Sequence, residues 1–189
     1  MRIILASKSE RRKELLKMLN IPFEIMSFDV EEKLNEDKNH YDECMNTAKE
    51  KAKAVFDKTE GDVIVIGSDT IVSFENKIYG KPKDYNDAFN MLKKFSNNSH
   101  EVISSLCLLV RKDGKEYEEL TYDKCMVFVD KMTDEEINSW IMENDVYTKA
   151  GAYAIQEGFS KFVTKTEGDY YSIVGLPLHK LYYLLKKYQ

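Results

Sequence analysis

The order of apolar and polar residues predicts a chain in which helices and strands are mixed. Apolar residues three and four positions apart, which mark one face of a helix, predict helices at residues 10–20, 41–58, 84–95, 133–144 and 177–187. Short apolar or alternating runs predict strands at residues 3–6, 63–66, 71–74, 78–79, 101–111, 116–129, 152–156 and 162–166. Residues 22–30 are expected to be extended, and residues 31–40 to form a polar loop.

Turn and capping signals complete this pattern. The pair Asp113-Gly114 predicts a tight hairpin between two strands. Thr133 and Glu136 have the spacing of a capping box at the start of a helix. Because hairpins interrupt a strict βαβ order, we expect an α/β fold with a mixed twisted sheet and flanking helices. The sequence shows no internal repeat and no low-complexity linker, so residues 1–189 are expected to form a single domain.

Composition narrows the classes of function. The net charge of −5 argues against a protein that binds nucleic acid electrostatically, although it leaves room for a local basic pocket. The longest apolar runs have the length of strands and fall short of the roughly 18–20 residues of a membrane span. Charged residues between Lys8 and Arg12 interrupt any signal-peptide core, so we expect a cytoplasmic protein. Cys44, Cys107 and Cys125 are widely spaced, which disfavours a zinc site or a disulfide framework.

The first candidate site is the junction between the strand at 3–6 and the helix at 10–20. Ser7, Ser9, Arg11 and Arg12 lie there, where free backbone N–H groups and the helix dipole favour an anion. Two arginines in a first helical turn are unfavourable in isolation, and a bound polyanion would offset them. The alternative is a capped surface helix with solvated arginines, and these residues alone do not decide between the two.

Asp69 is the sharpest single candidate. It follows the apolar run at 63–66 and Gly67-Ser68, so we expect it at the end of a buried strand, where sheet folds commonly carry reactive groups. A carboxylate there can coordinate a divalent cation or activate a water. The alternative is an Asx-turn, in which Asp69 only caps a loop.

Four further residues give weaker signals. Lys81, in the loop Gly80-Lys81-Pro82-Lys83, has an ammonium that can reach phosphate oxygens. Gln156 ends the predicted strand at 152–156, and its amide can pair with the polar edge of a base. On local pattern alone, Lys51 is a solvated helix residue and Glu32 an acidic loop residue.

Taken together, these blocks resemble the Maf family of nucleotide pyrophosphatases, once named for inhibition of septum formation. The resemblance rests on Leu5-Ala6-Ser7 through Ser9, Arg11-Arg12, Glu14-Leu15-Leu16, Ala48 through Lys51-Ala52, Gly67-Ser68-Asp69-Thr70, Gly80-Lys81-Pro82, Ser99-His100-Glu101-Val102, Lys149-Ala150-Gly151, Ile155-Gln156 and Val174-Gly175-Leu176-Pro177. The blocks stand in family order and span nearly the whole chain. Two positions depart from the family pattern: Glu10 replaces the usual Pro, and Ser172 replaces a frequent Asn.

The resemblance implies an α/β fold that is related to that of the inosine-triphosphate pyrophosphatases and has a deep two-lobed cleft. It also implies that the protein forms a homodimer. It implies hydrolysis of a nucleoside triphosphate to the monophosphate and pyrophosphate, with Mg²⁺ or Mn²⁺ as cofactor. By this resemblance Asp69 is the proton acceptor, and Glu32 and Asp69 hold the metal. The resemblance also implies that Ser9, Arg12, Lys51 and Lys81 bind phosphate. We add Ser7 to these expected phosphate-binding residues because it lies at the same strand-to-helix junction. Arg11, Thr70 and Gln156 match the positions that mark the branch preferring dTTP and UTP.

A second hypothesis is a non-catalytic regulator of cell division that binds nucleotide, as the old family name implies. A regulator could lose Asp69 or Lys81 without losing function, and this chain keeps both, which favours the enzyme. The expected partner in either case is a small nucleoside triphosphate, and neither a nucleic acid nor a membrane is expected as a partner.

Overall fold

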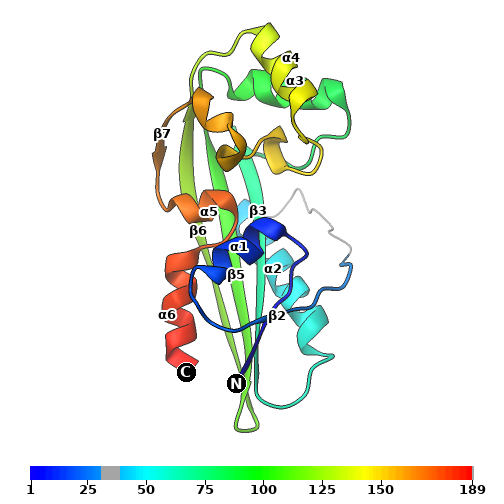
Figure 1. The fold of residues 1–189 in the computed structure, drawn as a ribbon, viewed down its shortest axis with the longest axis vertical. Coiled ribbons are helices and arrows are strands. Elements are labelled where there is room, and N and C mark those ends of the chain that lie inside the picture. The colour runs from blue at the N-terminus through cyan, green and yellow to red at the C-terminus, as the bar shows by residue number, and fades with distance from the viewer. Residues whose placement is uncertain (31–38, 189) are drawn as a thin grey trace. The chain divides into compact units, whose positions relative to one another are not determined.

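The computed structural model describes residues 1–30 and 39–188, and in it the chain divides into two compact units (Figure 1). The first unit comprises Met1–Thr70, Ser104–Asp123 and Gly175–Gln189, and the second comprises Ile71–Ile103 and Lys124–Val174. Each unit is described by itself below. The single domain over residues 1–189 and the cleft between two lobes therefore stay predictions.

The strands form a mixed sheet, as the sequence predicts. They are β1 (Arg2–Leu5), β2 (Glu24–Ile25), β3 (Val63–Phe74), β4 (Lys77–Tyr79), β5 (Ser99–Lys112), β6 (Lys115–Val129) and β7 (Val163–Glu167). The strand order is β2-β1-β3-β5-β6-β7, and β4 pairs with β3 off this path. β1 runs parallel to β2 and to β3, whereas β3–β4 and β6–β7 are antiparallel pairs. The predicted hairpin joins β5 to β6, with positive φ at Asp113 and Gly114.

The helices also follow the predicted pattern closely. They are α1 (Glu10–Lys17), α2 (His40–Phe56), α3 (Tyr85–Phe95), α4 (Asp134–Glu143), α5 (Tyr170–Val174) and α6 (Leu178–Tyr188). The predicted capping box is present at α4, where the side chains of Thr133 and Glu136 each accept from the other's backbone N–H. Only α5 was not expected. No described helix is long and apolar enough to cross a membrane.

The core of the first unit places α2 directly against β3. Ala48 and Ala52 on α2 and Val63 and Val65 on β3 are fully buried in one cluster. The contact is close because Gly67 has no side chain: a Cβ there would lie 2.2 Å from the carbonyl oxygen of Ala48. The small residues along this helix face therefore bring the backbone of α2 to the stretch of β3 that carries Asp69.

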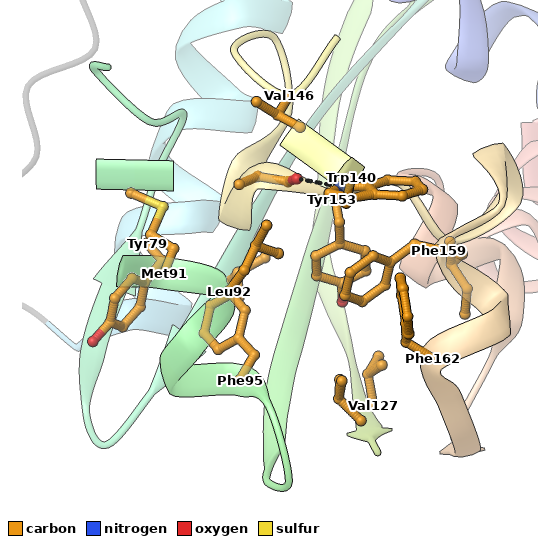
Figure 2. Packing of buried hydrophobic residues seen from close by; sticks show 14 of the residues in the cluster. Tyr79, Met91, Leu92, Phe95, Val127, Trp140, Val146, Tyr153, Phe159 and Phe162 are labelled. Carbon is orange, nitrogen blue, oxygen red and sulfur yellow. Dashed lines mark hydrogen bonds between the residues drawn. The ribbon is translucent and has the colours of Figure 1, made fainter. Parts of the chain in front are cut away.

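The core of the second unit is rich in aromatic rings (Figure 2). The indole N–H of Trp140 donates to the carbonyl of Ala152 at 3.2 Å, and the ring of Tyr153 stacks on Phe159 with centroids 4.3 Å apart. Nε2 of His100 lies 2.6 Å from the hydroxyl of Tyr153, and both residues are buried. These bonds satisfy the indole N–H of Trp140 and the hydroxyl of Tyr153, which would otherwise be costly to bury, whereas Nδ1 of His100 is buried without a hydrogen-bond partner among the described residues.

One predicted strand is wrong. Residues 152–156 form no strand but belong to a series of short 3₁₀ turns, η1 (Ala150–Ala152), η2 (Ile155–Glu157) and η3 (Phe159–Phe162). Gly151 and Ala152 have φ of 70° and 63°, which is left-handed backbone that a strand does not contain. The apolar run there is buried as a compact loop, because its rings pack into the core of the second unit.

Candidate functional site

Asp69 lies within a strand and not at its end, which corrects the expectation from the sequence. β3 continues without a break from Val63 to Phe74. The reason is a change of neighbour: β3 pairs in parallel with β1 up to Ile66 and in antiparallel with β4 from Val72 onward. Asp69 therefore follows the point at which β1 ends. The alternative of a loop-capping Asx-turn is excluded by the same observation.

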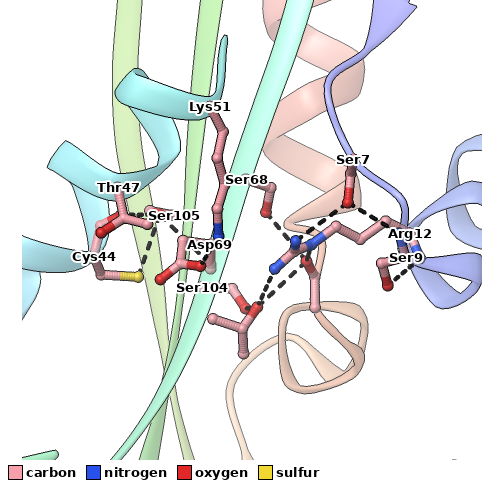
Figure 3. Close-up of polar contacts among 12 residues, drawn as sticks. Ser7, Ser9, Arg12, Cys44, Thr47, Lys51, Ser68, Asp69, Ser104 and Ser105 are labelled. Carbon is pink, nitrogen blue, oxygen red and sulfur yellow. Dashed lines mark hydrogen bonds and ion pairs between the residues drawn. The ribbon is translucent and has the colours of Figure 1, made fainter. Parts of the chain in front are cut away.

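Lys51 and Asp69 form the central ion pair of the first unit. Nζ of Lys51, on α2, lies 2.7 Å from Oδ1 of Asp69, and their side chains are only 19% and 14% exposed (Figure 3). Local sequence pattern made Lys51 a solvated residue, and the structure shows that this reading is wrong. The approach of α2 to β3 at Gly67 carries the ammonium to the carboxylate.

The predicted junction between β1 and α1 is present, with Ser9 as the N-cap of α1. The hydroxyl of Ser9 accepts from the backbone N–H of Arg12 at 3.5 Å, and that of Ser7 accepts from the backbone N–H of Ser9 at 3.2 Å. Nη1 of Arg12 also lies 3.4 Å from the Ser7 hydroxyl. The junction is therefore an ordered turn whose serines and arginine contact one another, at a helix end that favours anions.

The carbonyl of Gly175 ties this junction to β3. It accepts from Nε of Arg12 at 2.9 Å and from the hydroxyl of Ser68 at 3.1 Å, and the hydroxyl of Thr70 lies 3.5 Å from it. Gly175 has φ of 128°, a conformation that residues with a side chain rarely adopt. A Cβ there would also lie 3.4 Å from Oγ1 of Thr70. The glycine thus allows one carbonyl oxygen to gather donors from α1 and β3.

Two serines of β5 complete the polar cluster, although the sequence analysis did not single them out. Ser104 lies 2.8 Å from Oγ1 of Thr70, and Ser105 donates to the carbonyl of Cys44 at 2.7 Å. Burial, together with the charge of Asp69, raises the pKa of the Cys44 thiol to about 12, so the thiol stays protonated and donates to Ser105 at 3.2 Å. The available signal was a Ser-Ser pair inside an otherwise apolar strand.

Of the predicted site residues, the structure brings Ser7, Ser9, Arg12, Lys51, Asp69 and Thr70 into the contacts of the first unit. Arg11 is half-buried on α1 next to Arg12. Lys81 and Gln156 are exposed residues of the second unit. Their loops are joined there, since the N–H of Gly151 donates to the carbonyl of Gly80 at 3.0 Å. Glu32 lies outside the described residues.

The donors at the site suit a cation that is shared with a substrate better than one enclosed by protein. Among residues 1–30 and 39–188, no group of three or more His, Cys, Asp and Glu side chains is placed to hold a metal. Asp69 supplies one carboxylate in the same unit as the junction of Ser7, Ser9 and Arg12. Mg²⁺ is commonly held by one or two carboxylates together with substrate phosphates. A single carboxylate is therefore compatible with Mg²⁺ or Mn²⁺ shared with a substrate, and the cofactor stays a prediction.

Two solved structures have a weak similarity to this fold. The Staphylococcus aureus Ham1 protein matches with a TM-score of 0.45 at 16% identity, over 68% of this chain and 72% of that chain. A nucleoside-triphosphatase / dITP/XTP pyrophosphatase from Mycobacterium abscessus matches with a TM-score of 0.43 at 14% identity, over 70% of this chain and 76% of that chain.

Sequence relatives are much closer. A protein of Alkaliphilus oremlandii named dTTP/UTP pyrophosphatase is 45% identical over 98% of this chain and 95% of its own length. A protein of Clostridium novyi with the same name is 46% identical over 96% of this chain and 95% of its own length. The model of the family described as "Maf-like protein" matches residues 2–188. The chain therefore belongs to the Maf family.

Proposed function

We propose that this chain is a nucleoside triphosphate pyrophosphatase that converts dTTP and UTP to the nucleoside monophosphate and pyrophosphate. The observation that carries the proposal is the ion pair of Asp69 and Lys51 in the same unit as the anion-binding junction of Ser7, Ser9 and Arg12. The relatives named dTTP/UTP pyrophosphatase support the same substrates.

In the proposed reaction, the junction holds the phosphates. The backbone N–H groups at the start of α1 and the guanidinium of Arg12 donate to phosphate oxygens. Nε, Nη1 and Nη2 of Arg12 each also contact a protein oxygen, so the guanidinium is oriented before substrate arrives. A preorganised cation stabilises developing charge without reorganising during the reaction.

Asp69 is the proposed proton acceptor. Lys51 occupies Oδ1 of the carboxylate at 2.7 Å, and we assign the proton to Oδ2. The oxygen of a water forms a bond to the α-phosphorus, the bond from that phosphorus to the bridging oxygen breaks, and pyrophosphate leaves with the bonding electrons. Asp69 accepts the proton that the water loses. A bound Mg²⁺ or Mn²⁺, held by Asp69 and Glu32, would neutralise charge on the phosphates.

Selection of the base is assigned to Gln156, whose amide both donates and accepts. It can satisfy two neighbouring groups on the acceptor–donor–acceptor edge of uracil or thymine. Arg11 and Thr70 match the pyrimidine-preferring branch by resemblance. The hydroxyl of Thr70 lies 3.1 Å from Nη2 of Arg12, and this contact supports a second proposed role for Thr70, in orienting Arg12.

The test is release of pyrophosphate from a panel of nucleoside triphosphates with Mg²⁺ or Mn²⁺. We expect turnover of dTTP and UTP at a higher kcat/KM than ATP, GTP or CTP, and loss of turnover when the metal is chelated. Binding of nucleotide without turnover would favour the regulator instead. Preference for a purine would overturn the choice of base and leave the pyrophosphatase standing.

A further inference from the structure

The hydroxyl of Thr70 is crowded by three polar neighbours of the first unit. Nη2 of Arg12 lies 3.1 Å from Oγ1, the hydroxyl of Ser104 lies 2.8 Å away, and the carbonyl of Gly175 lies 3.5 Å away. The shortest of these contacts is the one to Ser104. Thr70 thus stands between the guanidinium on α1 and a serine on β5.

The protons in these contacts determine which hydroxyl donates. The guanidinium can only donate and the carbonyl of Gly175 can only accept, so Thr70 accepts from Arg12 and offers its own proton to Gly175. A hydroxyl has a single proton and two lone pairs. If the proton of Thr70 points to Gly175 and one lone pair accepts from Arg12, only the second lone pair of Oγ1 is left for Ser104. All three contacts can then be hydrogen bonds at the same time only if Ser104 is the donor to Thr70.

Burial makes this arrangement stable. Ser104 is fully buried on β5. Ile103 precedes it in the strand, Ser105 and Leu106 follow it, and all three are fully buried as well. A hydroxyl in such surroundings is costly unless it is hydrogen-bonded. The strand also fixes the backbone of Ser104, so its hydroxyl has a defined place 2.8 Å from that of Thr70.

We propose that Ser104 is a positioning residue of the phosphate site: its hydroxyl fixes that of Thr70, which in turn orients the guanidinium of Arg12. This role rests on the proposed function of Arg12 as a phosphate ligand. The role assigned to Ser104 is indirect and is exerted through Thr70. Its loss leaves the Thr70 hydroxyl able to turn, and Arg12 then loses a fixed acceptor for Nη2.

The test is a double-mutant cycle on Ser104→Ala and Thr70→Val, read by calorimetric binding of inorganic tripolyphosphate and by UTP turnover. Ser104→Ala should weaken tripolyphosphate binding about fivefold, which equals about 1 kcal/mol for one lost hydrogen bond. The KM for UTP should rise more than kcat falls. In the Thr70→Val background, which lacks the hydroxyl that Ser104 holds, Ser104→Ala should have less than about a twofold effect.

Two variants serve as controls. Ser104→Thr keeps a hydroxyl and should bind tripolyphosphate within about twofold of the wild type. Ser73→Ala removes another buried hydroxyl from β3, the strand of Thr70, and its effect should be small and additive with that of Thr70→Val. Thermal unfolding of each variant checks folding, and Ser104→Cys, which keeps a side chain of similar size but only a weak donor, replaces Ser104→Ala as the primary variant if the alanine unfolds.

Each outcome decides the role of Ser104. Additive effects in the cycle, or unchanged binding in Ser104→Ala, overturn it. The wild type could bind tripolyphosphate, and the cycle could show the expected coupling, while no nucleotide yields pyrophosphate. That result would support the positioning role of Ser104 and overturn the proposed function. A wild type that does not bind tripolyphosphate overturns the role, because Arg12 then has no phosphate to hold.

Discussion

At the scale of single residues, Asp69 is the group on which turnover should depend most. Asp69→Asn keeps the size of the side chain and an oxygen for Lys51, but an amide does not accept a proton as a carboxylate does. Loss of a general base commonly lowers the rate about 10²–10⁴-fold, and we expect a loss in kcat of that size with the fold intact. Steady-state release of pyrophosphate measures it, and circular dichroism checks the fold. A kcat near that of the wild type would exclude Asp69 as the base.

Arg12 and Lys81 should differ in how strongly their loss weakens substrate capture. Three nitrogens of Arg12 are fixed by protein oxygens, whereas Lys81 is an exposed residue of a loop. A guanidinium can grip phosphate through two parallel donors, and an ammonium acts as a point charge. We expect Arg12→Ala to lower kcat/KM for UTP by at least about tenfold, or ~1.4 kcal/mol, and Lys81→Ala to lower it less. A change within about twofold in Arg12→Ala would contradict the role as a phosphate clamp.

The residues of the site differ in how readily the sequence identifies them. Ser9 and Arg12 stand next to a recognisable boundary between a strand and a helix, and Asp69 follows a buried apolar run, so local pattern is enough to select them as candidates, although the strand end expected at Asp69 is absent. Lys51 looks like any other lysine of its helix, because only the tertiary approach of α2 to β3 gives it a partner. Ser104 and Gly175 contact residues far away in sequence. The Ser-Ser pair in an apolar strand marks Ser104 as unusual, but no local pattern identifies the partners of either residue.

At the scale of elements, the packing of α2 on β3 should control the ion pair. Gly67→Ala would place a Cβ 2.2 Å from the carbonyl of Ala48 and 2.8 Å from Cβ of Ala52, so the helix must move away from the strand. Overpacking of this kind typically costs about 1–3 kcal/mol, and it would also separate Lys51 from Asp69. We expect a lower midpoint of chemical denaturation and reduced turnover.

Gly80→Ala is the matched control for that change, because a Cβ at Gly80 meets nothing within 4 Å. It should leave the denaturation midpoint close to that of the wild type. Equal midpoints for Gly67→Ala and Gly80→Ala would show that α2 adjusts to the extra methyl at no cost, and the close packing would then not explain the position of Lys51.

The loop that carries Gln156 is held within the second unit by the side chain of Lys149. Nζ of the buried Lys149 donates to the carbonyl of Asp145 at 2.7 Å and pairs with Glu157 at 2.9 Å, so both ends of the loop are fixed to one side chain.

We expect Gln156→Leu to reduce the ratio of kcat/KM for UTP over ATP more than it reduces kcat/KM for ATP. A site built for hydrogen bonds discriminates strongly, and leucine forms none. Lys81→Ala is the comparison, since loss of a phosphate contact should lower kcat/KM for both nucleotides alike. An unchanged ratio of kcat/KM for UTP over ATP in Gln156→Leu would show that Gln156 does not select the base.

At the scale of the whole molecule, the sequence predicted the mixed sheet and most helices, because apolar periodicity follows directly from which face each element buries. It failed at residues 152–156, where apolar side chains enter the core from a loop with left-handed residues. It also failed to show that β3 passes through Asp69, because the strand exchanges one partner for another there. Both failures concern contacts with segments distant in sequence: core packing of the loop in the first case and strand pairing in the second. The expected homodimer and the cytoplasmic location stay predictions.

The stability of the molecule should fall in mild acid through the buried pair of His100 and Tyr153. Burial lowers the pKa of His100 to about 3 from an ordinary value near 6.5, so the unfolded chain binds a proton in the range between these values and the folded chain does not. The free energy of unfolding therefore decreases as pH falls below about 6.5, and this group alone should account for about 2 kcal/mol between pH 7.5 and pH 5.

His100→Phe tests this contribution, because it keeps an aromatic ring against Phe95 and removes the titrating nitrogen. The variant should be less stable at pH 7.5, where the hydroxyl of Tyr153 loses its partner, yet its stability should fall less between pH 7.5 and pH 5 than that of the wild type. Urea unfolding at both pH values measures the difference, and His179→Phe, at an exposed histidine of α6, is the control for removal of an imidazole as such. Equal losses in His100→Phe and the wild type would mean that other groups cause the acid sensitivity, since only the change at His100 removes a proton-binding site that folding buries.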